Sequence, residues 1–259
     1  MIQVHENIVY QANSNSRHKL DIYFPQLCPT MLPLIVYVHG GAWRTGQKDD
    51  FRAVAEGLIT TSQNRLAVAV INYRLSTSDA GSIKHPGHLN DVMAAVKFLV
   101  TDQSYPGRSI VDRTRVFLVG HSAGAHLSTL MALKPGFEYM SSVQGVLGIG
   151  GIYDIPQLLK DNPSYVEFID MAFASDEHAE ASPHRAAREM HGGARHVKFC
   201  VVHSFSDELV GPEQSARFAG QLVATGYSDV TLMVKELGSH DGALVNSEFW
   251  SLVVNFILT

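Results

Sequence analysis

Hydrophobic positions along the chain form short, nearly continuous runs, with amphipathic segments between them. The runs are rich in Val, Ile and Leu and fall at 34–38, 66–71, 115–119, 143–149, 197–202 and 230–237. Continuous apolarity is typical of strands that are buried on both faces. Helical spacing appears at 50–62, 88–102, 123–133, 213–225 and 243–257. This alternation predicts an α/β fold, with a mostly parallel sheet covered by helices on both faces.

Two parts of the chain depart from the alternation. The runs at 7–11 and 18–24 have no helix between them, which predicts an antiparallel, hairpin-like start to the sheet. Residues 152–195 carry helical fragments and many polar residues without a strand, and we interpret them as a cap insertion, called the cap segment below. No linker separates a second domain, so we expect one domain over residues 1–259.

Composition narrows the class of protein. Apolar residues make up 46% and charged residues 17%, which excludes a disordered chain. The formal charge of −5, without a basic stripe, argues against a nucleic-acid partner. Cys28 and Cys200 cannot form a disulfide framework and are expected to be free thiols. Because no secretory signal or bilayer-length apolar run appears, we expect a cytoplasmic protein without a membrane partner.

The strongest chemical motif is Gly120-His121-Ser122-Ala123-Gly124. It follows the apolar run 115–119 and precedes a helical pattern, which is the context of a nucleophile elbow. In such a turn the small residues let the backbone bend sharply and expose the serine hydroxyl above the sheet. The alternative is a plain turn from strand to helix. We predict that Ser122 is a catalytic nucleophile.

A serine hydroxyl needs a histidine to take its proton, and an acid to orient that histidine. In an elbow of this type the chain order is serine, acid, histidine. His240 has the required place, because it follows the apolar run 230–237 in a glycine-containing loop. We therefore predict that His240 is the general base.

The acid is expected after the preceding strand, and Asp207 lies just beyond the run 197–202. Glu208 is adjacent, and spacing alone does not exclude it. Asp154 follows the run 143–149, one strand earlier, and is the weaker alternative. Asp207 is our prediction.

Negative charge that develops on the substrate oxygen requires N–H donors that are already in place. His39-Gly40-Gly41-Ala42-Trp43 follows the run 34–38, and its adjacent glycines let backbone amides approach an oxyanion. We predict an oxyanion hole that uses Gly40 and Gly41, with the amide of Ala123 as a further donor.

Together with Asn72-Tyr73-Arg74-Leu75-Ser76, these motifs resemble the α/β-hydrolase superfamily, and within it the hormone-sensitive-lipase-like esterases and the kynurenine formamidases. The similarity to fungal kynurenine formamidases is closer. It extends through Gly150-Gly151-Ile152-Tyr153-Asp154, Asn162-Pro163-Ser164-Tyr165 and His203-Ser204-Phe205-Ser206-Asp207-Glu208-Leu209. The resemblance implies an α/β-hydrolase fold. It also implies an arylformamidase that cleaves N-formyl-L-kynurenine to L-kynurenine and formate in tryptophan catabolism, without a cofactor.

The roles that the resemblance implies are those predicted from the residues: Ser122 as nucleophile, Asp207 as acid, His240 as base and residues 39–43 as the oxyanion loop. A formyl-enzyme intermediate on Ser122 follows from this chemistry. A short-chain carboxylesterase shares these features and is the first alternative function. A non-catalytic, hydrolase-like binding module is the second.

Substrate-binding residues are expected in the cap segment. Tyr153 and Phe168, with Trp43 from the oxyanion loop, are predicted to line an apolar pocket for the aromatic ring of a small-molecule substrate. Tyr165, Met171 and Phe173 belong to the same concentration of large apolar residues. Packing of a helix on the core would explain these residues equally well.

Other polar residues admit two interpretations. His126 lies one helical turn beyond Ser122 and either approaches the site or packs in the core. His85, His88 and Asp91 invite a metal site, but a polar loop that leads into a helix explains them better, and we predict no metal. A homodimer is compatible with the sequence.

Overall fold

The computed structural model describes residues 1–12, 15–27, 30–189 and 196–259. Cys28 and the last six residues expected in the cap segment lie outside the described residues. An eight-stranded sheet organises the described chain, in the order β1-β2-β4-β3-β5-β6-β7-β8. Its strands are β1 (Ile2–Val9), β2 (Lys19–Pro25), β3 (Leu32–Val38), β4 (Ala67–Ile71), β5 (Val111–His121), β6 (Val143–Ile149), β7 (Lys198–Ser204) and β8 (Val230–Lys235).

The direction of the strands confirms the predicted α/β class. Strands β1, β2 and β4 pair antiparallel, and every pair from β4 through β3 to β8 is parallel. The central strands β3 and β4 are fully buried along their length, as their continuous apolarity predicts. Strand β8 lies at the edge of the sheet and is partly exposed, although its apolar run resembles those of the central strands.

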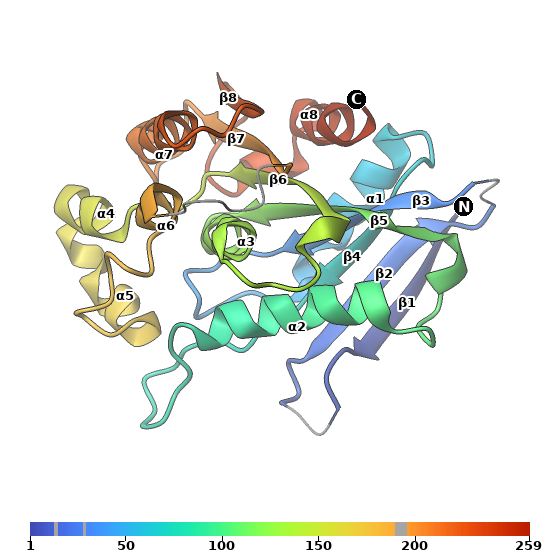
Figure 1. Cartoon of the computed structure of the whole chain (residues 1–259), viewed down its shortest axis with the longest axis horizontal. Helices are drawn as coiled ribbons and strands as arrows, with labels where there is room; N and C mark the ends of the chain where they lie inside the picture. The colour runs from blue at the N-terminus through green and yellow to red at the C-terminus, as the bar shows by residue number, and fades with distance from the viewer. Residues whose placement is uncertain (13–14, 28–29, 190–195) are drawn as a thin grey trace.

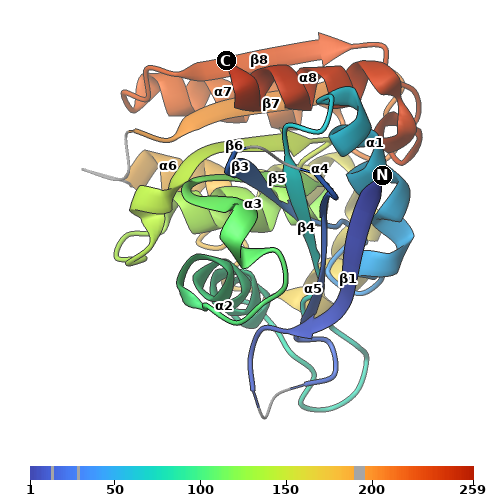
Figure 2. The same cartoon turned by 90° about the vertical axis from the view of Figure 1, so that its right-hand side faces the viewer.

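Helices cover both faces of the sheet (Figures 1 and 2). One face packs against α1 and α8, and the other against α2, α3 and α7. The longer helices are α1 (Arg52–Thr61), α2 (Gly87–Thr101), α3 (Ala123–Leu133), α7 (Pro212–Ala224) and α8 (Ser247–Leu258). Short 3₁₀ helices are η1 (Lys48–Phe51), η2 (Arg108–Ile110), η3 (Met140–Ser142), η4 (Pro163–Tyr165) and η5 (Gly242–Val245). Among the described residues, no helix has the length and apolarity needed to cross a membrane.

The described part of the cap segment is helical and contains no strand, as predicted. It consists of α4 (Ile155–Asp161), η4, α5 (Val166–Ala172) and α6 (Pro183–Glu189). Figure 1 shows α4 and α5 at one end of the molecule, while α6 lies beside α3. Apolar residues of the segment, among them Ile155, Ile169 and Phe173, belong to the same buried cluster as α2 and α3. The cap segment is therefore packed into the core over part of its length.

Candidate active site

Ser122 lies in a tight turn between β5 and α3. Its backbone has φ +53° and ψ −119°, a conformation that residues other than glycine rarely adopt. The turn also brings α3 very close to β3, because a Cβ built on Gly124 would lie 2.0 Å from the carbonyl oxygen of Val38. Strain of this kind costs on the order of 1–3 kcal/mol and persists where the surrounding structure enforces it. The surrounding fold therefore holds Ser122 at the carboxyl end of the central strands.

Asp207 and His240 meet at the ends of β7 and β8. The Nδ1–H of His240 donates a hydrogen bond to Oδ2 of Asp207, with 2.8 Å between the two atoms. Both side chains are nearly excluded from water. Because Nδ1 holds the proton in this pair, the other ring nitrogen, Nε2, is left to accept one. Ser122 and His240 both line one pocket.

The structure separates Asp207 from the two alternative acids. Glu208 accepts a hydrogen bond from the backbone N–H of His240, at 3.0 Å, and not from its ring. Asp154 lies elsewhere: it caps the start of α4 and pairs with Arg217. Among these three carboxylates, Asp207 alone contacts the imidazole of His240.

The environment of Asp207 favours its charged form. Burial raises the pKa of this carboxyl, but the hydrogen bond and charge of His240 lower it, as do the backbone N–H groups of Val210 and Leu209. The resulting pKa lies below its ordinary value. Oδ1 accepts those two backbone bonds at 2.9 and 3.0 Å, which leaves Oδ2 for the histidine. Asp207 is therefore held as a carboxylate in one orientation.

The loop after β3 adopts an unusual backbone. Gly41, Ala42 and Trp43 all have positive φ, at +104°, +51° and +58°. The N–H groups of Arg44 and Thr45 both donate to the carbonyl of Gly41, which closes the loop into a compact turn. A Cβ on Gly41 would lie 2.3 Å from the carbonyl oxygen of Thr45, so this turn needs glycine there.

The side chains of Tyr73 and His39 support this loop. The hydroxyl of Tyr73 donates to the carbonyl of His39 at 3.0 Å, and the two rings stack with 4.5 Å between their centroids. Burial lowers the pKa of His39 to about 4, so its ring is neutral. The ring Nδ1–H donates to the carbonyl of Gly40. Tyr73 comes from the Asn72–Ser76 motif, which therefore has a structural part in the site.

The predicted oxyanion donors lie beside Ser122. Gly40 lies directly against it, since a Cβ built on Gly40 would be 3.1 Å from the Cβ of Ser122. Within the described chain, the backbone N–H groups of Gly41 and Ala123 have no protein acceptor. Gly41 and Ala42 both line the pocket that contains Ser122. Free amides at the edge of the pocket are what an oxyanion requires.

The pocket has a volume of about 370 Å³ and mostly apolar walls. The cap segment contributes Ile152, Tyr165 and Phe168 to the lining, so Phe168 lies at the pocket. The hydroxyl of Tyr165 donates to the carbonyl of Leu209 and joins the cap to the Asp207 loop. The pocket is lined by Gly41, Ala42, Arg44, Thr45, His121, Ser122, Ile152, Tyr165, Phe168, Leu209, Val210, His240 and Asp241.

The predicted positions of Trp43 and Tyr153 in this pocket are wrong. Trp43 is fully buried and packs edge-on against His126 and Phe173. Tyr153 is 1% exposed and stacks on Phe218 of α7, with 4.4 Å between the ring centroids. Both aromatic side chains pack in the core because their loops turn them away from the pocket, so they support its walls without lining them.

His126 is a packing residue at the base of the site. Its Nε2–H donates to the carbonyl of Ala181 in the cap segment at 2.8 Å, and its ring is fully buried. Burial lowers its pKa to about 3, so it stays neutral. His126 does not line the pocket that contains Ser122.

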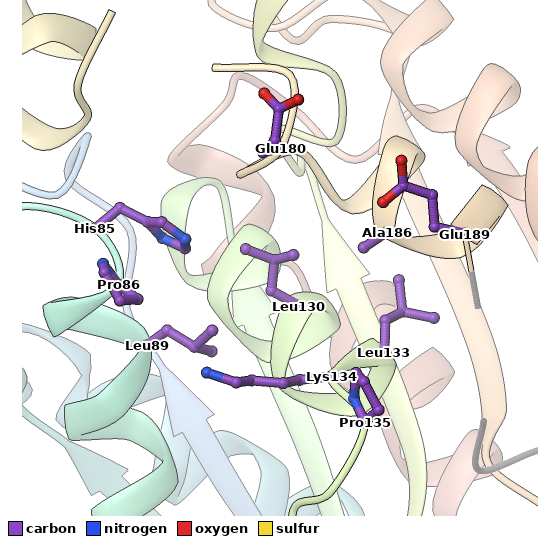
Figure 3. A pocket seen from close by; sticks show the side chains of 10 residues that line it. All are labelled: His85, Pro86, Leu89, Leu130, Leu133, Lys134, Pro135, Glu180, Ala186 and Glu189. Carbon is purple, nitrogen blue, oxygen red and sulfur yellow. The ribbon is translucent and has the colours of Figure 1, made fainter. Parts of the chain in front are cut away.

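His85, His88 and Asp91 have separate surroundings in the structure. Asp91 pairs with Arg74 and His18, and Nε2 of His88 is within hydrogen-bond distance of Ser76. His85 instead lies in a second pocket between α2, α3 and α6, where Figure 3 shows its ring pointing toward Leu130.

Among the described residues, one group of ligand types does gather: His121, His240 and Asp241 bring possible donor atoms within 4.8 Å of one another. Nε2 of His121 is already bonded to the carbonyl of His240, however, and Nδ1 of His240 to Asp207. We assign no metal to this group.

Sequence reasoning missed several residues of the pocket. Arg44 and Asp241 line it, and each directly follows a predicted site residue in the chain, which is a signal that was available. His121 lies within the Gly-x-Ser-x-Gly motif itself and packs its ring on His240, at 4.5 Å between centroids. Leu209 ends the His203–Leu209 motif but was given no role there, and Val210 carried no distinctive pattern.

Comparison with known proteins is consistent with this geometry. Residues 20–222 match the BD-FAE family. A kynurenine formamidase of Meyerozyma guilliermondii is 32% identical over 202 residues, which cover 73% of this chain and 71% of the relative. The kynurenine formamidase avaC of Aspergillus versicolor is 31% identical over 239 residues, which cover 80% of this chain and 82% of the relative.

Solved structures extend the similarity to the fold. A truncated carbohydrate esterase from gut microbiota superposes with a TM-score of 0.80 at 19% identity, over 98% of this chain and 95% of the other. At that identity the likeness concerns the fold, which is that of the α/β-hydrolases.

Proposed function

We propose a substrate for this chain from one premise: it belongs to the BD-FAE family of α/β-hydrolases and to the kynurenine formamidases. The substrate is N-formyl-L-kynurenine, and the products are L-kynurenine and formate. The observation that carries the proposal is the 2.8 Å hydrogen bond from His240 to Asp207, together with the position of His240 in the pocket that Ser122 also lines. The family membership selects the formamide among the acyl compounds that such a site can cleave.

The proposed reaction begins with attack of the Ser122 hydroxyl oxygen on the formyl carbon. His240 takes the hydroxyl proton at Nε2, while Asp207 holds the other ring nitrogen and stabilises the imidazolium that forms. The negative charge on the formyl oxygen is met by the backbone amides of Gly41 and Ala123, which have no protein acceptor within the described residues.

Collapse of this intermediate breaks the bond between carbon and nitrogen. His240 returns the proton to the leaving aromatic amine, whose nitrogen shares its lone pair with the ring and leaves more easily than an alkyl amine. Ser122 then carries the formyl group as an ester. Water, activated by His240, attacks that ester and releases formate, which restores the free hydroxyl.

The pocket walls suit an aromatic leaving group. Phe168, Tyr165 and Ile152 give apolar surface to the pocket that Ser122 also lines. Phe168 and Tyr165 pack at 5.0 Å between ring centroids and present a broad aromatic wall. A flat aminophenyl ring would bury apolar area there.

A direct assay tests the proposal. The purified chain is given N-formyl-L-kynurenine and, separately, acetate and butyrate esters, with Ser122→Ala as the inactive variant and the exposed Ser251→Ala as the matched control. We expect the formamide to have the highest kcat/KM and to require Ser122. Faster turnover of the butyrate ester would support a carboxylesterase instead, and activity that survives Ser122→Ala would exclude the proposed chemistry.

A further inference from the structure

Two side chains of opposite charge line the active-site pocket. Arg44 and Asp241 are both exposed, and both line the pocket that contains Ser122. Among the described residues, neither side chain forms an ion pair. The other side chains on the pocket wall are mainly apolar or aromatic, so these two charges are available to a ligand.

Backbone hydrogen bonds hold the main chain of Arg44 and of Asp241 in place. Arg44 follows the buried Trp43, and its N–H donates to the carbonyl of Gly41 at 3.0 Å. Asp241 follows His240 directly, and its carbonyl accepts the N–H of Leu244 in η5. Arg44 therefore lies in the loop that carries the Gly41 amide, and Asp241 lies in the loop that carries His240.

Contact with Phe168 leaves the donors of Arg44 free. The guanidinium carbon lies 5.2 Å from the centroid of the Phe168 ring. A guanidinium placed over an aromatic ring uses its face, and the N–H groups along its edge remain able to bind a carboxylate through two parallel hydrogen bonds. Phe168 thus holds an anion-binding group beside the apolar wall of the pocket.

We propose that Arg44 and Asp241 bind the α-amino-acid head group of the substrate, with Arg44 on its carboxylate and Asp241 on its ammonium group. The inference rests on the proposed function and names the part of that substrate that the catalytic residues do not touch. The amino-acid chain is attached ortho to the formamide nitrogen, through a ketone and one methylene group. Arg44 and Asp241 line the same pocket as Ser122 and Phe168, so a substrate whose formyl carbon is at Ser122 has its head group in the cavity that these two charges border.

Four formanilides that share the same ring, ketone and formamide separate the two contacts. N-formyl-L-kynurenine carries both charges, and its decarboxylated amine carries only the ammonium group. The 4-oxobutanoate analogue carries only the carboxylate, and 2′-formamidoacetophenone carries neither. Each is assayed with the wild-type chain, Arg44→Gln and Asp241→Asn. The matched controls are Arg52→Gln, on the exposed face of α1, and Asp176→Asn, in the chain between α5 and α6.

We expect Arg44→Gln to lower kcat/KM about fivefold for the two substrates with a carboxylate, as loss of an exposed charge-assisted contact implies. The other two substrates should stay within about twofold of wild type, and the loss should fall on KM because the head group binds equally in ground and transition states. Because a carboxylate oxygen of Asp241 lies within 4.8 Å of a ring nitrogen of His240, Asp241→Asn is judged by the ratio between substrates within the variant. We expect its kcat/KM to fall more for the two substrates with an ammonium group than for the two without one. The control variants should change none of the four.

Equal effects of Arg44→Gln on all four formanilides, or no effect on any, would overturn the inference while leaving the formamidase proposal intact. Turnover of 2′-formamidoacetophenone by the wild-type chain at the same kcat/KM as N-formyl-L-kynurenine would also overturn it. Hydrolysis of esters without hydrolysis of any formanilide would reject the proposed function, and the inference with it.

Discussion

Replacing His126 by glutamine removes one buried titrating group from the base of the active site. The glutamine amide keeps a donor for the carbonyl of Ala181, which the Nε2–H of His126 occupies at 2.8 Å. The substitution therefore changes the ability to take up a proton more than it changes packing. It also distinguishes a packing role from a catalytic one, because the two roles predict different responses to pH.

The magnitude follows from the pKa of His126 in the folded and unfolded chain. Burial lowers the pKa to about 3 in the folded protein, against an ordinary value of about 6.5 when the chain unfolds. Below about pH 6.5 the unfolded chain binds a proton at this residue and the folded chain does not, so acid lowers the free energy of unfolding. At pH 5.5 the loss is about 1.4 kcal/mol for this one group, and at pH 7.5 it is below about 0.1 kcal/mol.

Urea unfolding at pH 7.5 and pH 5.5 measures this difference. We expect the free energy of unfolding to fall by about 1.4 kcal/mol less in His126→Gln than in the wild type between the two pH values. His196→Gln, at a position exposed to water, serves as control and should follow the wild type. The kcat/KM of His126→Gln at pH 7.5 should stay within about threefold of wild type, about 0.7 kcal/mol in activation free energy. An unchanged pH dependence, or a loss of activity beyond tenfold in a folded variant, would refute this reasoning.

Three further outcomes test the site and its supports. Asp207→Asn should lower kcat by about 10⁴, because an amide favours the wrong tautomer of His240, whereas Glu208→Gln and Asp154→Asn should lower it far less. Steady-state kinetics of the three variants measure this, and a severe loss of activity in Asp154→Asn would refute the assignment of Asp207 as the acid. Trp43→Ala should lower the free energy of unfolding by about 3–5 kcal/mol, as measured by urea titration, and a loss below about 1 kcal/mol would contradict its packing in the core. A formyl anilide should exceed the matching acetyl anilide in kcat/KM by about tenfold to two-hundredfold, and equal rates would exclude a tight acyl site.

Local sequence patterns were enough to predict most of the sheet. The run 34–38 lies within β3 and the run 143–149 coincides with β6, because buried parallel strands need apolar side chains on both faces. The N-terminal strand was less accurate: β1 spans Ile2–Val9, whereas its apolar run was placed at 7–11. An edge strand with polar positions has no continuous run to mark its ends.

The candidate site also has a part that the sequence predicted and a part that it did not. The order of the motifs predicted that Asp207 and His240 follow neighbouring strands, and in the structure these side chains are hydrogen-bonded. The lining of the pocket was harder to predict. Trp43 and Phe168 are equally apolar in the sequence, yet one is fully buried in the core and the other lines the pocket. The direction in which a loop turns a side chain depends on tertiary packing, which no local pattern encodes.

The burial of Trp43 bears on how this scaffold can be re-engineered. Its ring packs edge-on against Phe173 of the cap segment, with 4.8 Å between the centroids, and Nζ of Lys84 donates to the carbonyl of Asp170 in α5. A chimera that exchanged only the cap segment for that of another hydrolase would lose the Phe173 contact of Trp43 and the two carbonyls, of Asp170 and Phe173, that accept from Lys84. The transferable module therefore includes the loop around Trp43 and the turn that carries Lys84, so that selectivity and oxyanion geometry are inherited together.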